Sequence, residues 1–404
     1  MGLNSTPLAE RLHISLFGKR NAGKSSLMNG LTGQQLAIVS PVKGTTTDPV
    51  YKAMELLPLG PVVFIDTPGL DDEGTLGKLR IQKTYEVLHK TDVALLVVDA
   101  TMGLTEEDTK MQQLLERQQI PYLLIMNKCD KLPESYNPPK QEGIYWVCTQ
   151  NKEDMETLKN AIGQKVPLEE PHHPLVADLI EPSDFVVLVV PIDKAAPKGR
   201  LILPQQQTIR ELLEADATTI VVKEYELKNT LSQLGKKPQL VITDSQVFGQ
   251  VARDTPSDIL LTSFSILFAR YKGNLPQLIG GVTALETLQE GDKVLIAEGC
   301  THHRQCDDIG SVKLPHRIKE YTGKTLSYAF CSGVGFPIDL SPYKLIVHCG
   351  GCTLTPRAMV YRLKEAERQG IPITNYGILI AHMQGILKRS LSPFPSLLLT
   401  LDTL

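Results

Sequence analysis

The stretch that decides the fold reads HISLF at residues 13–17 and runs directly into GKRNAGKS at residues 18–25. The apolar run predicts a buried strand, and the two glycines predict a tight loop that ends where a helix begins at Lys24. A loop of this kind turns backbone N–H groups inward, and the helix N-terminus adds a partial positive charge. The stretch therefore predicts a phosphate-binding loop between a strand and a helix.

Three further apolar runs have the same character, and each ends at a polar residue. They cover residues 62–65, 93–98 and 122–126, and they lead to Asp66, Asp99 and Asn127. Apolar runs without alternation are typical of parallel strands covered on both faces. Because open α/β sheets bind ligands at the carboxyl ends of their strands, we expect these polar residues to surround one ligand.

The polar residues belong to two short motifs, DTPG at residues 66–69 and NKCD at residues 127–130. Together with the loop they predict a site for GTP and Mg²⁺, because a carboxylate in the second motif accepts two donors that guanine has and adenine lacks. The predicted catalytic residues are Lys24 toward the β- and γ-phosphates, Ser25 and Asp66 for Mg²⁺, and the Gly69 N–H for the γ-phosphate. The residues that these motifs predict to bind GTP or GDP are Gly18, Asn21, Ala22, Gly23, Lys24, Ser25, Ser26, Asn127, Lys128 and Asp130.

This segment resembles the G domain of Era/TrmE-like, translation-factor-class GTPases. The resemblance places switch I at GTTTD, residues 44–48, and implies Thr46 as the second Mg²⁺ ligand, with Thr45 and Thr47 as alternatives. It also implies that Asn21 binds K⁺, so we expect GTP hydrolysis to be stimulated by K⁺. Leu70 stands where Ras-like enzymes carry a glutamine that orients water, and we therefore expect slow unaided hydrolysis. Cys148-Thr149 occupies the place of the family's base-contacting Ser-Ala, so the resemblance implies that Cys148 and Thr149 also bind the guanine nucleotide, mainly through their backbone.

Bulk properties limit the class of protein. The 404 residues predict two or three domains, and the net charge of −3 argues against a nucleic-acid-binding surface. We expect no membrane span, because no run of about 18 apolar residues occurs. The first 12 residues lack the apolar core of a signal peptide, which predicts a cytoplasmic protein. Seven cysteines in that compartment are expected to be reduced, so clustered ones suggest metal ligands.

The expected fold class is α/β, with a P-loop GTPase domain followed by two further α/β domains whose sheets are mainly parallel. The pattern breaks near residue 167, where prolines, glutamates and two histidines follow one another. We predict a GTP-binding domain at 1–166, a linker at 167–178, a dimerisation domain at 179–264 and a cluster-binding domain at 265–404. No catalytic constellation stands out in the third of these segments.

The C-terminal region carries two cysteine motifs about fifty residues apart, C-T-H at residues 300–302 and H-C-G-G-C at residues 348–352. Each follows a predicted strand, so Cys300, Cys349 and Cys352 can converge at one sheet edge. Thiolates suit an iron–sulfur cluster or Zn²⁺. Three cysteines would hold a [4Fe–4S] cluster whose fourth site goes to His302, His348, a carboxylate or an exchangeable group. A closed Cys₃His zinc site is the alternative, and spacing alone does not separate the two.

The whole chain resembles the HydF family, the [FeFe]-hydrogenase maturation GTPases, because a GTPase domain precedes C-x-H and H-C-x-x-C. The resemblance implies a [4Fe–4S] cluster on the three cysteines and a diiron subcluster precursor made by radical-SAM maturases and passed to apo-[FeFe]-hydrogenase. It implies a homodimer through the middle domain, or a tetramer, and GTP hydrolysis that adjusts partner binding. The alternative function is a zinc-stabilised regulatory or ribosome-associated GTPase.

Overall fold

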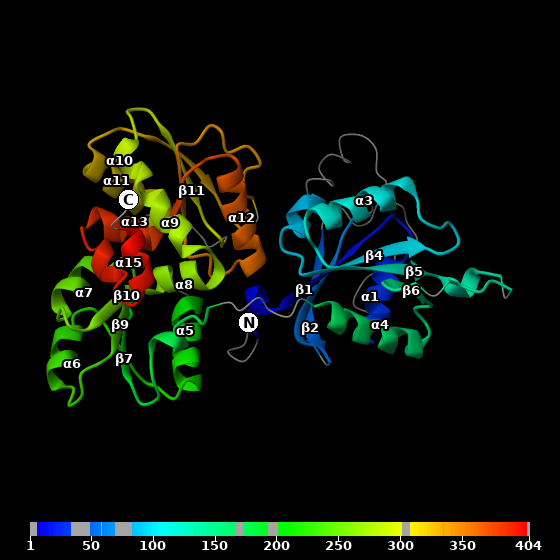
Figure 1. Cartoon of the computed structure of the whole chain (residues 1–404), viewed down its shortest axis with the longest axis horizontal. Helices are drawn as coiled ribbons and strands as arrows, with labels where there is room; N and C mark the ends of the chain where they lie inside the picture. Colours follow the sequence, from blue (N-terminus) through cyan, green and yellow to red (C-terminus); the bar gives the residue numbers. More distant parts are fainter. Residues whose placement is uncertain are drawn as a thin grey trace. The chain divides into compact units, whose positions relative to one another are not determined.

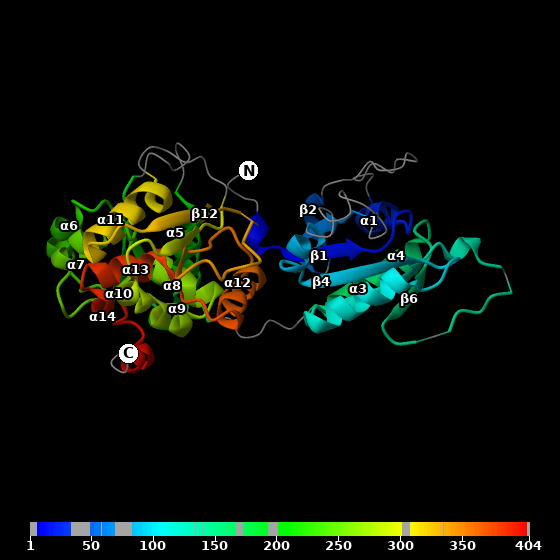
Figure 2. The same cartoon turned by 90° about the horizontal axis from the view of Figure 1, so that it is seen from above.

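A computed structural model describes residues 6–33, 49–57, 59–68, 83–133, 135–139, 141–166, 173–192, 201–300, 308–333 and 335–401. The chain divides into two compact units, Met1–Glu170 and Pro171–Leu404. Figures 1 and 2 show the first unit in blue to blue-green and the second in green to red. Each unit is described here by itself.

The first unit is built on one six-stranded sheet with the order β2-β3-β1-β4-β5-β6. Its strands are β1 (Leu12–Phe17), β2 (Val50–Leu56), β3 (Gly60–Asp66), β4 (Val93–Asp99), β5 (Tyr122–Asn127) and β6 (Ile144–Val147). Only the edge pair β2–β3 is antiparallel, and its outer strand β2 alternates in exposure while the central strands are almost entirely buried. Unbroken burial matches strands that are covered on both faces.

Helices cover both faces of this sheet. One face packs against α1 (Lys24–Thr32) and α4 (Lys152–Lys165), and the other packs against α3 (Glu106–Arg117), as Figure 1 shows. Short 3₁₀ turns lie at η1 (Leu8–Glu10) and η2 (Cys129–Lys131). The start of α3 is fixed by a capping box, in which the Asp108 carboxylate accepts from the Thr105 N–H at 3.1 Å.

The second unit contains two four-stranded sheets in which every strand pair is parallel. One sheet has the order β10-β9-β7-β8 and the other has the order β12-β11-β13-β14. The first comprises β7 (Phe185–Val189), β8 (Thr218–Val222), β9 (Leu240–Thr243) and β10 (Leu260–Ser263), and the second comprises β11 (Lys293–Ala297), β12 (Ser327–Cys331), β13 (Leu345–His348) and β14 (Ile373–Asn375).

One continuous apolar core joins the two sheets of this unit, from Leu175 to Phe394. Helix α8, which follows β10, packs against α12, α13 and β14 and so links the sheets. The helices are α5 (Leu203–Glu214), α6 (Leu227–Gln233), α7 (Phe248–Asp254), α8 (Phe264–Lys272), α9 (Leu275–Val282), α10 (Ala284–Thr287), α11 (Leu314–Thr322), α12 (Pro356–Arg368), α13 (Tyr376–Met383), α14 (Leu387–Ser390) and α15 (Pro395–Leu401), with short turns at η3 (Ala177–Leu179) and a π-helical turn η4 (Ile309–Lys313).

The predicted fold class is confirmed: a P-loop GTPase domain is followed by α/β structure with parallel sheets. The apolar run near residue 260 predicts a strand at 258–262, and the structure places its start two residues later, at Leu260–Ser263. Thr355 before Pro356 predicts an N-cap, which is confirmed because the Thr355 side chain accepts from the Ala358 N–H. The domain boundaries stay predictions. Across the described residues, no helix is both long and apolar enough to cross a membrane.

Helix α9 approaches β14 so closely that one position requires glycine. A Cβ atom on Gly281 would lie 2.0 Å from the Ile373 carbonyl oxygen, whereas a Cβ on its neighbour Gly280 would meet nothing within 4 Å. The two glycines therefore form a matched pair on one helix.

We predict that Gly281→Ala lowers the free energy of unfolding by about 1–3 kcal/mol or more, because a backbone atom cannot move aside as a side chain can. Gly280→Ala should be neutral or stabilise by up to about 1 kcal/mol, since alanine restricts the unfolded chain. Thermal unfolding of both variants checks this. Equal stability of the two variants would contradict the close approach of α9 and β14.

Candidate functional site

The loop after β1 is shaped by two glycines that no other residue can replace. Gly18 has φ +141°, and a Cβ there would lie 2.1 Å from the Val97 carbonyl oxygen. Gly23 has φ +93°, and a Cβ there would lie 2.2 Å from Asn127 Nδ2. Both positions combine a left-handed backbone with close approach to β4 or β5. The loop is thus pressed against the carboxyl ends of the sheet.

Two of the residues predicted to bind Mg²⁺, Ser25 and Asp66, lie together at this edge. Ser25 Oγ donates to Asp66 Oδ2 at 2.5 Å, while the buried Asp66 Oδ1 has no hydrogen-bond partner among the described residues. Burial raises the pKa of Asp66, although Ser25 and Lys24 oppose the shift. A hydroxyl and a carboxylate with a free buried oxygen fit an oxygen-loving divalent cation, which would also hold the carboxylate ionised.

Lys24 lies over the loop it belongs to. Its side chain is buried, and Nζ donates to the carbonyl oxygens of Gly18 and Lys19, each at 2.8 Å. The ammonium is therefore held within the curve of the loop, where the phosphates of a nucleotide would meet it.

The NKCD motif braces the same loop from the neighbouring strand. Asn127 Nδ2 donates to the Ala22 carbonyl at 2.9 Å, and Lys128 Nζ donates to the Asn21 carbonyl at 2.5 Å and to Asp99 Oδ2 at 2.6 Å. Burial acts to raise the pKa of Asp99, but the hydrogen bonds from Lys128 and Thr101 outweigh it and hold that pKa below its usual value. These contacts fix the loop to β4 and β5.

The guanine end of the site is more open. Asp130 is exposed at η2, which leaves its carboxylate accessible to a base. The Cys148 N–H donates to Asp154 Oδ2 at 2.7 Å, and the Thr149 carbonyl lies 3.0 Å from where a Cβ on Gly30 would be. The backbone of Cys148 and Thr149 is therefore held by α4 and α1. Ser26 lies within α1, partly buried.

Some of the predicted site residues lie outside the described part of the chain. These are Thr45, Thr46 and Thr47 of switch I, Gly69 and Leu70 after β3, and His302. Their roles stay predictions.

The cysteine motifs lie at the carboxyl edge of the second sheet in the second unit. Ala297 at the end of β11 pairs with Cys331 of β12 on one side and with His348 of β13 on the other. Cys300 follows β11 by three residues and Cys349 follows β13 directly, so the register brings both motifs to one edge. Ligation by Cys300, Cys349 and Cys352 stays a prediction.

Gly299, the residue that precedes the first motif, contacts the second motif at Cys349. Cys349 Sγ accepts from the Gly299 N–H at 3.0 Å and from the Gly351 N–H at 3.4 Å. The approach is close, because a Cβ on Gly299 would lie 2.9 Å from Leu354 Cγ. Two backbone N–H groups directed at one sulfur favour its thiolate, which is the form that binds metal.

Burial opposes ionisation of these thiols. It raises the pKa of Cys349, and it raises the pKa of Cys352 to about 11, although nearby Lys272 opposes the second shift. A bound metal would have to displace these protons, so metal affinity should rise with pH. All six cysteines in the described ranges are free thiols.

His348 does not offer a ring nitrogen to the cysteines. It is fully buried, its Nδ1 lies 2.7 Å from the Cys349 carbonyl oxygen, and its Nε2 lies 2.8 Å from an Arg362 nitrogen. Burial and Arg362 lower its pKa to about 3, so the ring is neutral. Because both ring nitrogens are already engaged, this arrangement does not support His348 as a metal ligand.

Buried charged side chains around the motif could not be identified from the sequence pattern. Lys272, at the end of α8, donates from Nζ to the carbonyls of Cys352 at 2.9 Å and Leu354 at 3.0 Å. Glu298 lies buried beside the cysteines and accepts from the Tyr376 hydroxyl at 3.2 Å. In the sequence, Glu298 is marked only by its position between an apolar strand and Cys300.

The residue types at this edge suit a metal centre, but the side chains described there do not surround one point. Among the described residues, no three His, Cys, Asp or Glu side chains lie close enough together to hold an ion. The segment between Cys300 and Asp308, which contains His302, is not among the described residues. The contact at Cys349, the free thiols and the buried cations nevertheless suit an anionic metal–sulfur group.

Three family descriptions match successive parts of the chain. Residues 13–128 match a 50S ribosome-binding GTPase domain, residues 175–273 match the hydrogen maturase F dimerization domain, and residues 276–393 match the hydrogen maturase F tetramerization domain.

Relatives with known names match parts of the chain. The tRNA modification GTPase MnmE of Chromobacterium violaceum is 40% identical over 139 residues, which are 34% of this chain and 30% of that protein. GTPase Era of Rippkaea orientalis is 30% identical over 244 residues, or 58% of this chain and 76% of Era. The chain therefore spans less than a third of MnmE. Among solved structures, Era in complex with MgGDPNP and nucleotides of 16S ribosomal RNA has 21% identity and a TM-score of 0.35, and the match covers 53% of this chain and 94% of Era.

We predict that Lys128→Met weakens the binding of both GDP and GTP about 10- to 100-fold, because each charge-assisted hydrogen bond contributes about 1.5–3 kcal/mol. Equilibrium titration with a fluorescent guanine nucleotide measures the change. Lys131→Met is the matched control, since Lys131 is exposed on the same short turn. Unchanged affinity in Lys128→Met would show that the loop does not need this brace.

Proposed function

Because the chain belongs to the hydrogen maturase F family and carries a GTPase domain, we propose that it is a GTPase and iron–sulfur scaffold. In this proposal it assembles or delivers the diiron subcluster of the H-cluster to apo-[FeFe]-hydrogenase. The diiron precursor is cargo, and radical-SAM hydrogenase maturases are the partners that supply it. The protein acts in the cytoplasm, where its thiols stay reduced.

The observation that carries this proposal is the contact of Cys349 with Gly299, the residue that directly precedes the distant C-T-H motif. The Gly299 N–H and the Gly351 N–H both point at Cys349 Sγ, so the loop before Cys300 and the loop before Cys352 share one sulfur. A loop pair that served only for packing would not need backbone donors directed at a thiol. Cys300, Cys349 and Cys352 are the proposed ligands, and His302 or an exchangeable group takes the fourth position.

A [4Fe–4S] cluster, when bound, supplies an anionic redox centre with one coordination position for another ligand. The protein's own part is to present three thiolates at the edge of a rigid parallel sheet and to enclose them with buried cations. The edge position leaves the group accessible to a partner, which a carrier requires.

GTP binding is assigned to the first unit, and its hydrolysis adjusts partner binding rather than the chemistry of the cluster. The γ-phosphate orders switch loops and its loss releases them, which changes the surface a partner meets. Thr46 and Gly69 are the residues proposed to sense it. The family domains for dimerisation and tetramerisation support an oligomer, and we propose a homodimer that can form a tetramer.

A second candidate is a zinc-stabilised regulatory or ribosome-associated GTPase. One observation favours it: residues 13–128 match a domain described as ribosome-binding. The proposed Cys₃His donor set would also suit Zn²⁺. Metal analysis separates the two candidates directly.

We predict about four iron and four sulfide per chain after anaerobic reconstitution, with a reducible S = 1/2 EPR signal. Cys300→Ala and Cys349→Ser should lose the signal and most of the iron while the GTPase rate is unchanged, because they lie outside the unit that binds nucleotide. Cys129→Ser, a thiol of the nucleotide unit, is the control and should keep its iron. One zinc per chain and no sulfide would establish the second candidate instead.

We predict that K⁺ raises the GTP hydrolysis rate at least about tenfold over Na⁺, a barrier change of about 1.4 kcal/mol. Asn21 is exposed at the loop and has φ +63°, so Asn21→Gly removes the side-chain oxygen without straining the backbone. That variant should bind GDP normally and respond equally to both ions. Equal rates in K⁺ and Na⁺ for the unmodified protein would exclude a K⁺ site.

A further inference from the structure

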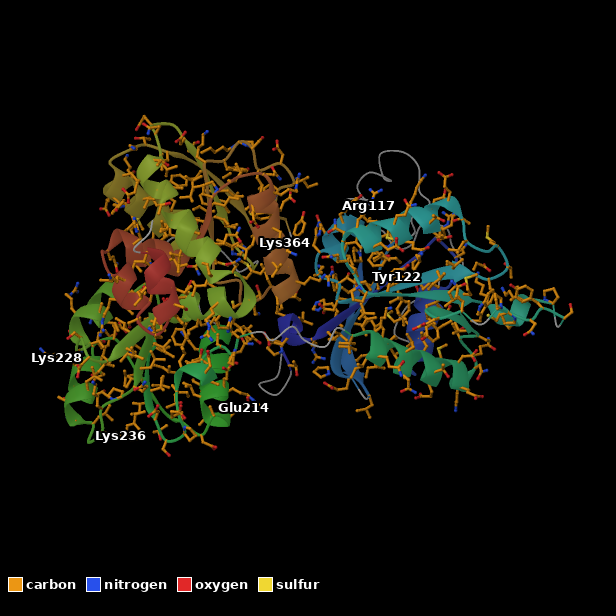
Figure 3. The ribbon with its side chains drawn as sticks, viewed as in Figure 1. Arg117, Tyr122, Glu214, Lys228, Lys236 and Lys364 are labelled. Carbon is orange, nitrogen blue, oxygen red and sulfur yellow. The ribbon has the colours of Figure 1, made fainter. Side chains whose placement is uncertain are left out.

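Helix α12 carries a charged residue at a position where its pattern requires an apolar one. The buried positions are Met359, Arg362, Leu363 and Ala366, which follow the spacing of a core-facing stripe. Arg362 is only 3% exposed, whereas Lys364 on the same helix points away from the core, as labelled in Figure 3. An arginine in the core stripe needs a reason, because burying a charge is costly.

The contacts of Arg362 do not explain why a charged side chain is buried there. One guanidinium nitrogen lies 2.8 Å from His348 Nε2, another donates to the Gly333 carbonyl, and the guanidinium lies 5.0 Å from the Phe336 ring centroid. All three partners are neutral. Within the described ranges of the chain, no carboxylate forms an ion pair with Arg362.

The ionisable groups that act on Arg362 include two cysteine thiols. Burial lowers the pKa of Arg362, whereas Cys331, Cys349 and Tyr361 act to raise it. The link to Cys349 is also structural. Arginine always donates, so His348 Nε2 accepts and His348 Nδ1 must carry the hydrogen that it gives to the Cys349 carbonyl. Arg362 thereby fixes the tautomer and the position of the residue beside a proposed ligand.

We propose that Arg362 is the counter-charge of the cysteine site, a positioning residue that balances the negative charge of the thiolates and of the metal group they hold. The inference rests on the proposed function, because only a loaded site brings in that negative charge. Without it the cation is a destabilising feature of the fold, and with it the two charges stabilise one another. Arg362 thus couples occupancy of the cysteine site to the stability of the second unit, although it is not itself a metal ligand.

Four proteins test the proposal: the unmodified chain, Arg362→Gln, Arg362→Lys and Lys364→Gln. Glutamine keeps a donor but loses the charge, lysine keeps the charge, and Lys364→Gln removes an exposed charge from the same helix. Each is measured first without metal by thermal unfolding, and then after anaerobic loading with Fe²⁺ and sulfide. The readouts after loading are the rise in unfolding temperature, the iron retained against a chelator, and the midpoint potential from an EPR titration.

We predict that metal-free Arg362→Gln unfolds no earlier than the unmodified chain but gains less stability on loading. Its iron affinity should fall about 10- to 100-fold, as is usual when a partner of a ligand is removed. Its midpoint potential should become more negative, because a nearby cation favours the more negative reduced cluster. Arg362→Lys should restore most of both properties, and Lys364→Gln should change neither.

The other outcomes are decisive as well. If metal-free Arg362→Gln is destabilised and yet loads like the unmodified chain, Arg362 has only a packing role and the proposal fails. It also fails if Lys364→Gln has the same effect or if lysine does not rescue. If the unmodified chain takes up Zn²⁺ but no iron or sulfide, the proposed function is wrong, and the same four proteins compared for Zn²⁺ affinity still decide the role of Arg362.

Discussion

The parallel arrangement of the strands is the constraint on which both candidate sites depend. Parallel strands all end at the same edge, so the loops that follow them meet there whatever their separation along the chain. In the first unit this brings the phosphate-binding loop beside Asp66 and Asn127. In the second unit it brings the segment after β11 beside the segment after β13. The nucleotide site and the proposed metal site therefore both depend on the shared carboxyl edge of parallel strands.

The two sites handle buried polarity in different ways. At the nucleotide site the lysines already have partners: Lys128 pairs with Asp99, and Lys24 donates to its own loop. Among the described residues, the buried side-chain oxygens of this site that lack one are Asp66 Oδ1 and Asn127 Oδ1. At the cysteine site the groups are mismatched until something binds, because burial keeps the thiols protonated while a buried cation lies near them. The first site is preorganised for its ligand, and the second becomes electrostatically balanced only when it is occupied.

Helix α8 connects the two sheets of the second unit. It belongs to the segment that matches the dimerization domain, yet Lys272 at its end donates to the carbonyls of Cys352 and Leu354 in the segment that matches the tetramerization domain. Ser265 at its start also accepts from the Gly377 N–H and from Asn375. Helix α8 therefore contacts the loop that carries Cys352 as well as the first sheet.

The sequence by itself determined the strand–loop–helix of the nucleotide site, the parallel sheets and the start of α12, because these follow from local patterns: apolar runs, glycine spacing and an N-cap before Pro356. It also placed the cysteine motifs after strands. Only the tertiary structure decided which neighbours those motifs meet. That His348 faces Arg362 rather than the cysteines, and that Lys272 holds their loop, depends on contacts 14 and 80 residues apart in the chain. Such contacts are set by how helices pack on a sheet, and a single sequence carries no local signal for them.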